Sequence, residues 1–113
     1  MPYNIRMFEF IETPLFTKAL ERYLDDDEYA ALQAMLNKNA EAGVVVPGSG
    51  GVRKLRWAAE GRGKRGGLRV IYFLRLAKDQ IWMLTVYGKN VRENIPAHTL
   101  RAIKEAIENA END

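Results

Sequence analysis

The spacing of apolar residues along the chain predicts a strand followed by a helix at the N-terminal end. From Tyr3 to Phe10 apolar and polar positions largely alternate, which is typical of a strand with one buried face. From Leu15 to Leu24 the apolar residues instead recur every three or four positions, the period of an amphipathic helix. Thr13-Pro14 stands just before this segment, and a threonine cap followed by proline favours a helix start there.

A second helix is predicted directly after the first. Residues 25–27 are all aspartate, and carboxylates are favoured near the positive end of a helix dipole. An apolar stripe from Tyr29 to Leu36 follows, and we expect the helix to end near Gly43. The two helices would form a hairpin. We interpret its acidic turn as capping chemistry rather than a metal site, because adjacent aspartates readily serve as caps.

Three more strands and a final helix complete the pattern. Residues 52–58 alternate, whereas residues 68–74 and 81–87 are almost continuously apolar, as central strands are. Residues 77–80 predict a short hairpin connection, and Gly48 to Gly51 predict a flexible hinge. Pro96 can open the last helix, whose apolar stripe runs from Leu100 to Ala110. The order βααβββα predicts an α+β fold: an antiparallel sheet with an N-terminal helical hairpin and a C-terminal helix packed on one face.

Composition limits the possible chemistry. The 113 residues are 47% hydrophobic, enough for one domain, 1–113, that buries its own core. The chain has no cysteine and one histidine, which excludes disulfides, thiolate sites and multi-histidine metal sites. We therefore expect neither a metal nor a cofactor. No apolar run approaches the roughly 18 residues of a membrane helix, so a cytoplasmic location is expected.

The net charge of +2 conceals a strong segregation of charge along the chain. Residues 1–52 hold 4 Lys/Arg and 8 Asp/Glu, residues 53–92 hold 11 and 2, and residues 93–113 hold 2 and 5. The three segments therefore carry −4, +9 and −3. Because clustered cations attract phosphates, the middle segment is predicted to bind RNA or DNA. The alternative is a solvated basic face without a partner.

Three cations on two neighbouring strands predict a phosphate site. Lys54 and Arg56 project from one face of their strand, and Arg53 projects from the other. Arg69 interrupts a buried apolar strand, so it must find an ion-pair partner or open onto a cleft. If the two strands pair, the cations at 54, 56 and 69 can converge, which is unfavourable unless a polyanion neutralises them.

The end of the last predicted strand carries two further candidate site residues. Tyr87 and Lys89 lie on the same alternating face if the strand continues, and Tyr87 can stack on a base or take part in proton transfer. Its alternative role is an aromatic residue at the edge of the core. Trp57 and Trp82 are expected in the core and His98 at the surface, so none of the three is assigned to the site.

The run from Gly50 to Ala58, the stretch from Gly61 to Tyr72 and the segment from Leu84 to Asn90 together resemble the RelE superfamily of bacterial toxins, and the HigB-like branch most closely. The resemblance implies a RelE-like fold and the toxin of a type II toxin–antitoxin system. Such a toxin enters the ribosomal A site and cleaves mRNA, and a co-encoded antitoxin, here a helix-turn-helix HigA-like protein, neutralises it. This sequence departs from the RelE pattern at Asn90, where an arginine is expected. It also departs in its last helix, which has no clear catalytic tyrosine.

By position, the resemblance assigns catalytic roles to five residues, Lys54, Arg56, Arg69, Tyr87 and Lys89, and RNA binding to Arg53, Arg62, Lys64 and Arg65. The expected reaction is metal-independent: the 2′-hydroxyl of the substrate attacks the adjacent phosphorus, leaving a 2′,3′-cyclic phosphate and a 5′-hydroxyl end. Fixed arginines would stabilise the developing charge. Lys54 or Tyr87 would accept the 2′ proton, and Lys89 or an arginine would protonate the leaving oxygen. A ParE-like DNA gyrase poison and a non-catalytic nucleic-acid-binding module remain alternatives.

Overall fold

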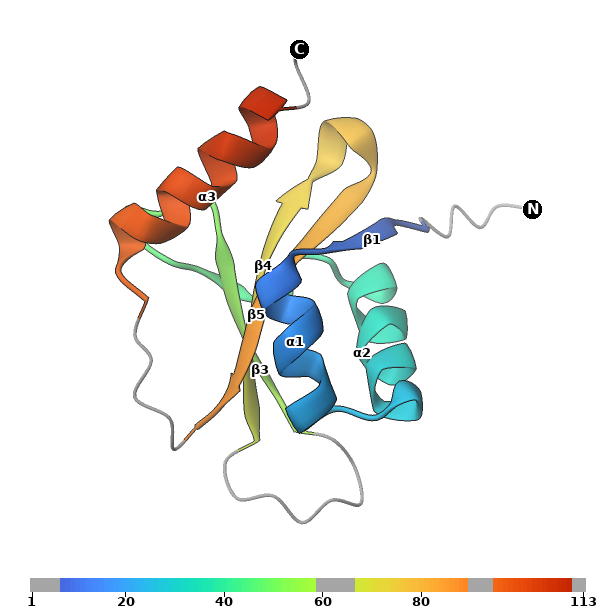
Figure 1. Ribbon diagram of the computed structural model, residues 1–113. Helices are drawn as coiled ribbons and strands as arrows, with labels where there is room; N and C mark the ends of the chain where they lie inside the picture. The colour runs from blue at the N-terminus through green and yellow to red at the C-terminus, as the bar shows by residue number, and fades with distance from the viewer. Residues whose placement is uncertain (1–6, 59–66, 90–94, 111–113) are drawn as a thin grey trace, which may run out of the picture.

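Five strands form one mixed sheet in the computed structural model, which describes residues 7–58, 67–89 and 95–110 (Figure 1). The strand order is β1-β5-β4-β3-β2. The strands are β1 (Glu9–Glu12), β2 (Val44–Val45), β3 (Arg53–Trp57), β4 (Leu68–Arg75) and β5 (Gln80–Gly88). The predicted start of the first strand, residues 3–6, lies outside the described residues.

Strand β1 corrects the prediction of a wholly antiparallel sheet. It runs parallel to β5, with Glu9 opposite Gln80 and Glu12 opposite Met83, whereas the other strand pairs are antiparallel. A parallel neighbour requires a long crossover connection, and the intervening helices and strands supply it. The short strand β2 was not predicted either. The α+β class is confirmed.

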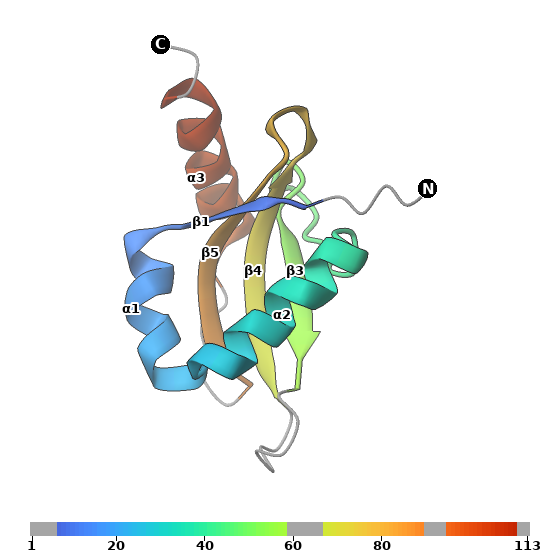
Figure 2. The same cartoon turned by 90° about the vertical axis from the view of Figure 1, so that its right-hand side faces the viewer.

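The helices lie on both faces of the sheet and not on one face as predicted. α1 (Pro14–Tyr23) and α2 (Asp26–Lys38) belong to one side, and α3 (Ala97–Ala110) lies behind the other, as Figure 2 shows. One core joins the first two helices to Leu55, Val70 and Tyr72, and a second joins α3 to Ile71 and Phe73. Because both faces of β4 are covered by a core, its sequence is almost continuously apolar.

Hydrogen bonds at the helix starts fix the hairpin as the sequence predicts. The Thr13 hydroxyl oxygen accepts from the backbone N–H of Phe16 at 3.1 Å and donates to the carbonyl of Leu84 at 2.7 Å, which ties α1 to β5. Asp25 and Glu28 form a reciprocal capping box at 2.8 Å in each direction. The capping interpretation of the acidic turn is thereby confirmed.

The segments that follow α2 differ from the prediction. The helix ends at Lys38, before Gly43, because the chain leaves it to meet Tyr72. The Tyr72 hydroxyl donates to the carbonyl of Ala40 at 2.7 Å and accepts from the N–H of Gly43 at 2.9 Å. The predicted hinge is also wrong. Ser49 is fully buried, and its hydroxyl donates to Val46 at 2.6 Å, which closes the turn.

Candidate active site

Two arginines and a tyrosine form a row across three neighbouring strands. Arg56 of β3 lies opposite Arg69 of β4, and Arg69 lies opposite Tyr87 of β5. Residues directly opposite in an antiparallel sheet share a face, with Cβ atoms about 4.5–5.5 Å apart. Lys54, two residues before Arg56, shares that face and lies opposite Ile71. The predicted placement of the three cations, Lys54, Arg56 and Arg69, on one face is therefore confirmed, and Tyr87 shares that face.

This face is only partly covered by α3. The helix packs through Leu100 and Ile107 on Ile71 and Phe73, which lie farther along β4 than Arg69. Figure 1 shows α3 at one end of the sheet, while the opposite ends of β3, β4 and β5 extend beyond it. The row of Arg56, Arg69 and Tyr87 belongs to those opposite ends.

Two of the three cations of β3, Lys54 and Arg56, are accessible and have no ion-pair partner among the described residues. Arg56 is exposed and Lys54 is half-buried. Lys54 and Arg56 also line a shallow groove with Val44 and Val45 of β2, whose side chains are exposed. These cations can therefore be reached by an anion that approaches this face.

Arg69 and Tyr87 are more enclosed. Arg69 is half-buried, and its guanidinium donates to the carbonyl of Leu68 at 3.4 Å. Tyr87 is 7% exposed and packs with the core beneath α3, so its ring orientation is set by packing. Lys89, just beyond β5, is exposed, and its N–H donates to Gly67 at 3.4 Å. The strand end thus places a fixed tyrosine beside an accessible lysine.

Arg53 lies on the opposite face from Lys54, as its place in the alternation predicts. Its guanidinium donates to the carbonyl of Gly43 at 2.8 Å and to that of Glu41 at 3.2 Å, and it pairs with the Glu41 carboxylate at 3.7 Å. It faces Tyr72, whose pKa is raised by burial and lowered to a lesser extent by the Gly43 hydrogen bond. These contacts attach Arg53 to the segment after α2 and separate it from the row.

The loop cations expected to grip RNA, Arg62, Lys64 and Arg65, lie outside the described residues, as does Asn90. The base of that loop is described at Gly67, which has φ of +65°. A Cβ atom there would lie 2.6 Å from the carbonyl oxygen of Trp57. Only glycine fits this position, since both the backbone conformation and the close approach disfavour a side chain.

The other predicted positions agree with the sequence analysis. Trp57 and Trp82 are half-buried and pack against the two cores, while His98 is exposed on α3. Within residues 7–58, 67–89 and 95–110, no group of three His, Cys, Asp or Glu side chains is close enough to hold a metal ion. None of the described helices is long and apolar enough to cross a membrane.

One part of this surface was not anticipated from the sequence. A hollow of about 330 Å³ beside Tyr87 is lined from α1 by residues that include Lys18, Arg22 and Tyr23. The spacing of the two cations by four residues is a visible signal of a shared helix face. The sequence could not indicate that this face meets β5, because that depends on tertiary packing.

Comparison with known proteins identifies the class. A family model described as the RelE toxin of the RelE/RelB toxin–antitoxin system matches residues 12–112. The chain is therefore a toxin-antitoxin toxin, and it belongs to the RelE toxin family. A solved structure of E. coli toxin RelE, a double arginine-to-alanine mutant in the free state, has a similar fold, with a TM-score of 0.54 and 14% identity over 87% of this chain and 97% of that chain.

Proposed function

We propose that this toxin is a ribosome-dependent, metal-independent endoribonuclease that cleaves mRNA in the cytoplasm and so inhibits translation. The observation that carries the proposal is the cross-strand row of Arg56, Arg69 and Tyr87, with Lys54 on the same face. A row of cations next to a tyrosine suits a phosphodiester with an adjacent base. Membership of the toxin family supplies the biological context.

The arginines have the position required to stabilise a phosphoryl transition state. Arg56 and Arg69 lie opposite each other, so both guanidinium groups can donate to the non-bridging oxygens of one phosphate. Preorganised donors aimed at developing charge are commonly the largest catalytic contribution. The nucleophile is the 2′-hydroxyl of the substrate, which forms the 2′,3′-cyclic phosphate as the bond to the 5′-oxygen breaks.

Proton transfer is assigned to the remaining site residues. Lys54 as the uncharged amine, or Tyr87 as the phenolate, accepts the proton of the 2′-hydroxyl, since both lie on the face of the arginines. Lys89 or an arginine delivers a proton to the departing 5′-oxygen. The ribosome would orient the strand in the A site, and such positioning can account for much of a rate enhancement.

The antitoxin partner is expected to act on this same face. We propose a helix-turn-helix, HigA-like antitoxin that covers the cationic row or blocks entry into the ribosome. Acidic residues on its contact surface would complement the unneutralised Lys54 and Arg56. Full cleavage activity in a complex saturated with antitoxin would contradict this arrangement.

The proposed function is tested by induced expression of the wild type and of Arg69→Ala in bacterial cells, with growth recorded and mRNA 5′ ends mapped. Growth arrest with new 5′-hydroxyl ends inside translated frames, lost in the variant, is the expected result. Circular dichroism and thermal unfolding of the purified variant control for folding. Arrest with intact mRNA and altered DNA supercoiling would indicate a ParE-like gyrase poison. Nucleic-acid binding without cleavage or arrest would indicate a non-catalytic module.

A further inference from the structure

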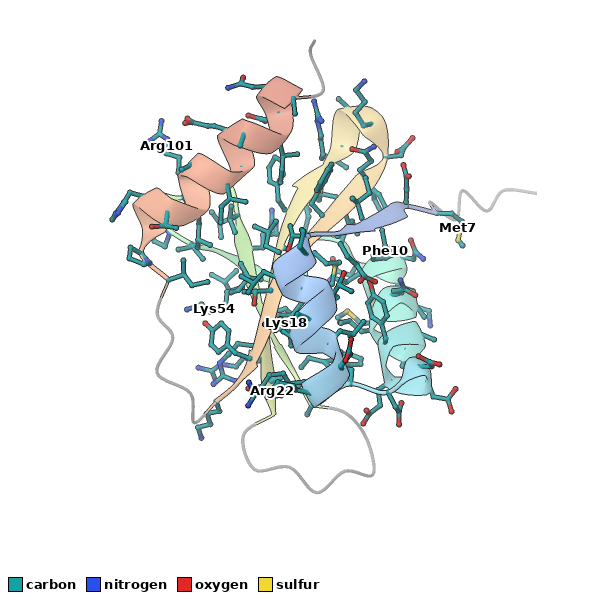
Figure 3. The ribbon with its side chains drawn as sticks, viewed as in Figure 1. Met7, Phe10, Lys18, Arg22, Lys54 and Arg101 are labelled. Carbon is teal, nitrogen blue, oxygen red and sulfur yellow. The ribbon has the colours of Figure 1, made fainter. Side chains whose placement is uncertain are left out.

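Two cations of α1 lie beside the end of the proposed catalytic row. Lys18 and Arg22 are one helical turn apart, so they share a helix face, and both are exposed. They line the hollow of about 330 Å³ whose opposite wall includes Thr85 and Tyr87 of β5. In Figure 3 both side chains extend from α1 on the side of the lower part of β5. The hollow therefore joins α1 to the strand that carries Tyr87.

The pairing of β5 explains why α1 lies at this position. β1 pairs with β5 from Gln80 to Met83, and the chain then turns into α1. The N–H of Thr13 donates to the carbonyl of Met83 at 3.1 Å, and this bond is where α1 joins β5. Beyond that point α1 takes the place of a neighbouring strand. Across the sheet, the cations of α1 thus lie next to β5, on the side away from β4.

The two cations are not neutralised by the described part of the chain. Neither Lys18 nor Arg22 forms an ion pair there, although Glu21 lies on the same helix. Like charges four residues apart disfavour a helix. The guanidinium of Arg22 lies over the ring of Tyr23, 5.8 Å from its centroid, which restricts the conformations of the arginine. Arg22, restricted in conformation by Tyr23, and the neighbouring Lys18 are together suited to bind an anionic ligand.

We propose that Lys18 and Arg22 form a second phosphate subsite, which binds the backbone of the substrate RNA strand next to the scissile phosphate. The inference rests on the proposed function, because the subsite would bind the same RNA molecule that is cleaved at the row. The RNA would pass from Arg56 and Arg69 over Tyr87 to the hollow between α1 and β5. The subsite binds phosphate and not base edges, so it adds affinity without sequence preference.

The test measures binding of single-stranded 2′-O-methyl RNA, which has no free 2′-hydroxyl and cannot be cleaved, by fluorescence anisotropy between 50 and 200 mM salt. The oligonucleotides are a dinucleotide and a hexanucleotide. The double variant K18Q/R22Q is compared with K38Q/K78Q, which removes the same charge from exposed positions on α2 and the β4–β5 connection. Cosedimentation with 70S ribosomes is measured for the same proteins.

We expect K18Q/R22Q to weaken hexanucleotide binding about tenfold, or roughly threefold for each cation, and to reduce the salt slope by about 1.4. Dinucleotide binding and the control variant should remain at wild-type values. Equal hexanucleotide affinities for K18Q/R22Q and K38Q/K78Q would overturn the subsite alone. A loss confined to ribosome cosedimentation would assign the two cations to ribosomal RNA and overturn the substrate subsite. If the wild type binds neither RNA but cosediments with ribosomes, the substrate subsite is overturned and the proposed function stands. If the wild type neither binds RNA nor cosediments with ribosomes, the proposed function is overturned as well.

Discussion

Arg56 lies directly opposite Arg69 on the neighbouring strand, so two guanidinium groups share one position on one face of the sheet. Like charges directly opposite each other in a sheet are unfavourable. Arg56 is exposed, no described residue forms an ion pair with it, and threonine is a better strand residue. This pair therefore indicates a site kept for function at the expense of stability.

Arg56→Thr should stabilise the fold while abolishing toxicity. Removing the repulsion should raise the melting temperature by about 1–5 °C, corresponding to about 0.2–1 kcal/mol. Thermal unfolding of the free toxin measures the change. The gain should disappear in 1 M salt, where the Debye length is about 3 Å. A lower melting temperature than the wild type at low salt would contradict the repulsion argument.

Gly67→Ala should destabilise the protein. The new Cβ would meet the Trp57 carbonyl oxygen at 2.6 Å, at a φ of +65°. We expect a loss of about 1–3 kcal/mol in the free energy of unfolding, measured by urea denaturation. Gly48→Ala is the matched control, because Gly48 has a φ of +80° and the atom nearest to the added Cβ, on Ala97, lies at an ordinary contact distance of 3.6 Å. Equal losses in the two variants would show that the close approach is unimportant.

Tyr72→Phe should remove two hydrogen bonds at once, one buried and one partly buried. The Tyr72 hydroxyl donates to the carbonyl of Ala40 and accepts from the N–H of Gly43, so the change leaves a partly buried carbonyl and a buried N–H without this partner. The expected loss is about 1–3 kcal/mol in the free energy of unfolding at neutral pH. The segment that holds Arg53 and Glu41 should loosen as well, which hydrogen exchange at Gly43 would detect.

The stability of the wild type should fall above pH 10 because of the ionisation of Tyr72. Burial raises the pKa of Tyr72 above its ordinary value of 10.0 in the folded state. Above pH 10 the unfolded tyrosine loses its proton first, so the unfolded state binds fewer protons and stability decreases as pH rises. The difference in stability between wild type and Tyr72→Phe should therefore narrow above pH 10. A constant difference from pH 8 to pH 11 would contradict the pKa direction.

Asp25→Ala should weaken the helical hairpin without touching the site. The variant loses the hydrogen bond from the N–H of Glu28, and a lost cap typically costs about 0.5–2 kcal/mol. Asp27→Ala is the control, since Asp27 lies within the first turn but is not the cap. Chemical denaturation compares the two variants, and RNA cleavage at 25 °C should be unchanged in both. A greater loss in Asp27→Ala would contradict the cap assignment.

Local patterns predicted most of the elements. The alternation in β3 correctly separated Lys54 and Arg56 from Arg53, and Thr13 and Asp25 marked both starts of the hairpin. These features depend on neighbours in sequence. The parallel pairing of β1 with β5 and the position of α3 on the second face depend on contacts between distant segments, and periodicity does not encode them.

The same division applies to the site. The cations of β3 and β4 were predictable because adjacent strands of a hairpin pair in a fixed order, which brings Arg56 opposite Arg69. The hollow between α1 and β5 was not, because Lys18 and Tyr87 are far apart in the chain and line one hollow only after α1 has packed on β5. Arg62 and Lys64 stay sequence-based predictions, since they lie outside the described residues.

The most direct test of the proposed site compares neighbouring residues of one strand that face opposite ways. Purified Lys54→Gln and Arg53→Gln proteins each lose one positive charge, and their cleavage of mRNA on programmed 70S ribosomes is measured at a temperature where circular dichroism shows both to be folded. We predict a loss of about 100-fold or more for Lys54→Gln, as is typical for a proton-transfer residue, and a rate near that of the wild type for Arg53→Gln. Equal losses in the two variants, or a loss confined to Arg53→Gln, would contradict the assignment of the catalytic site to the face of Arg56, Arg69 and Tyr87.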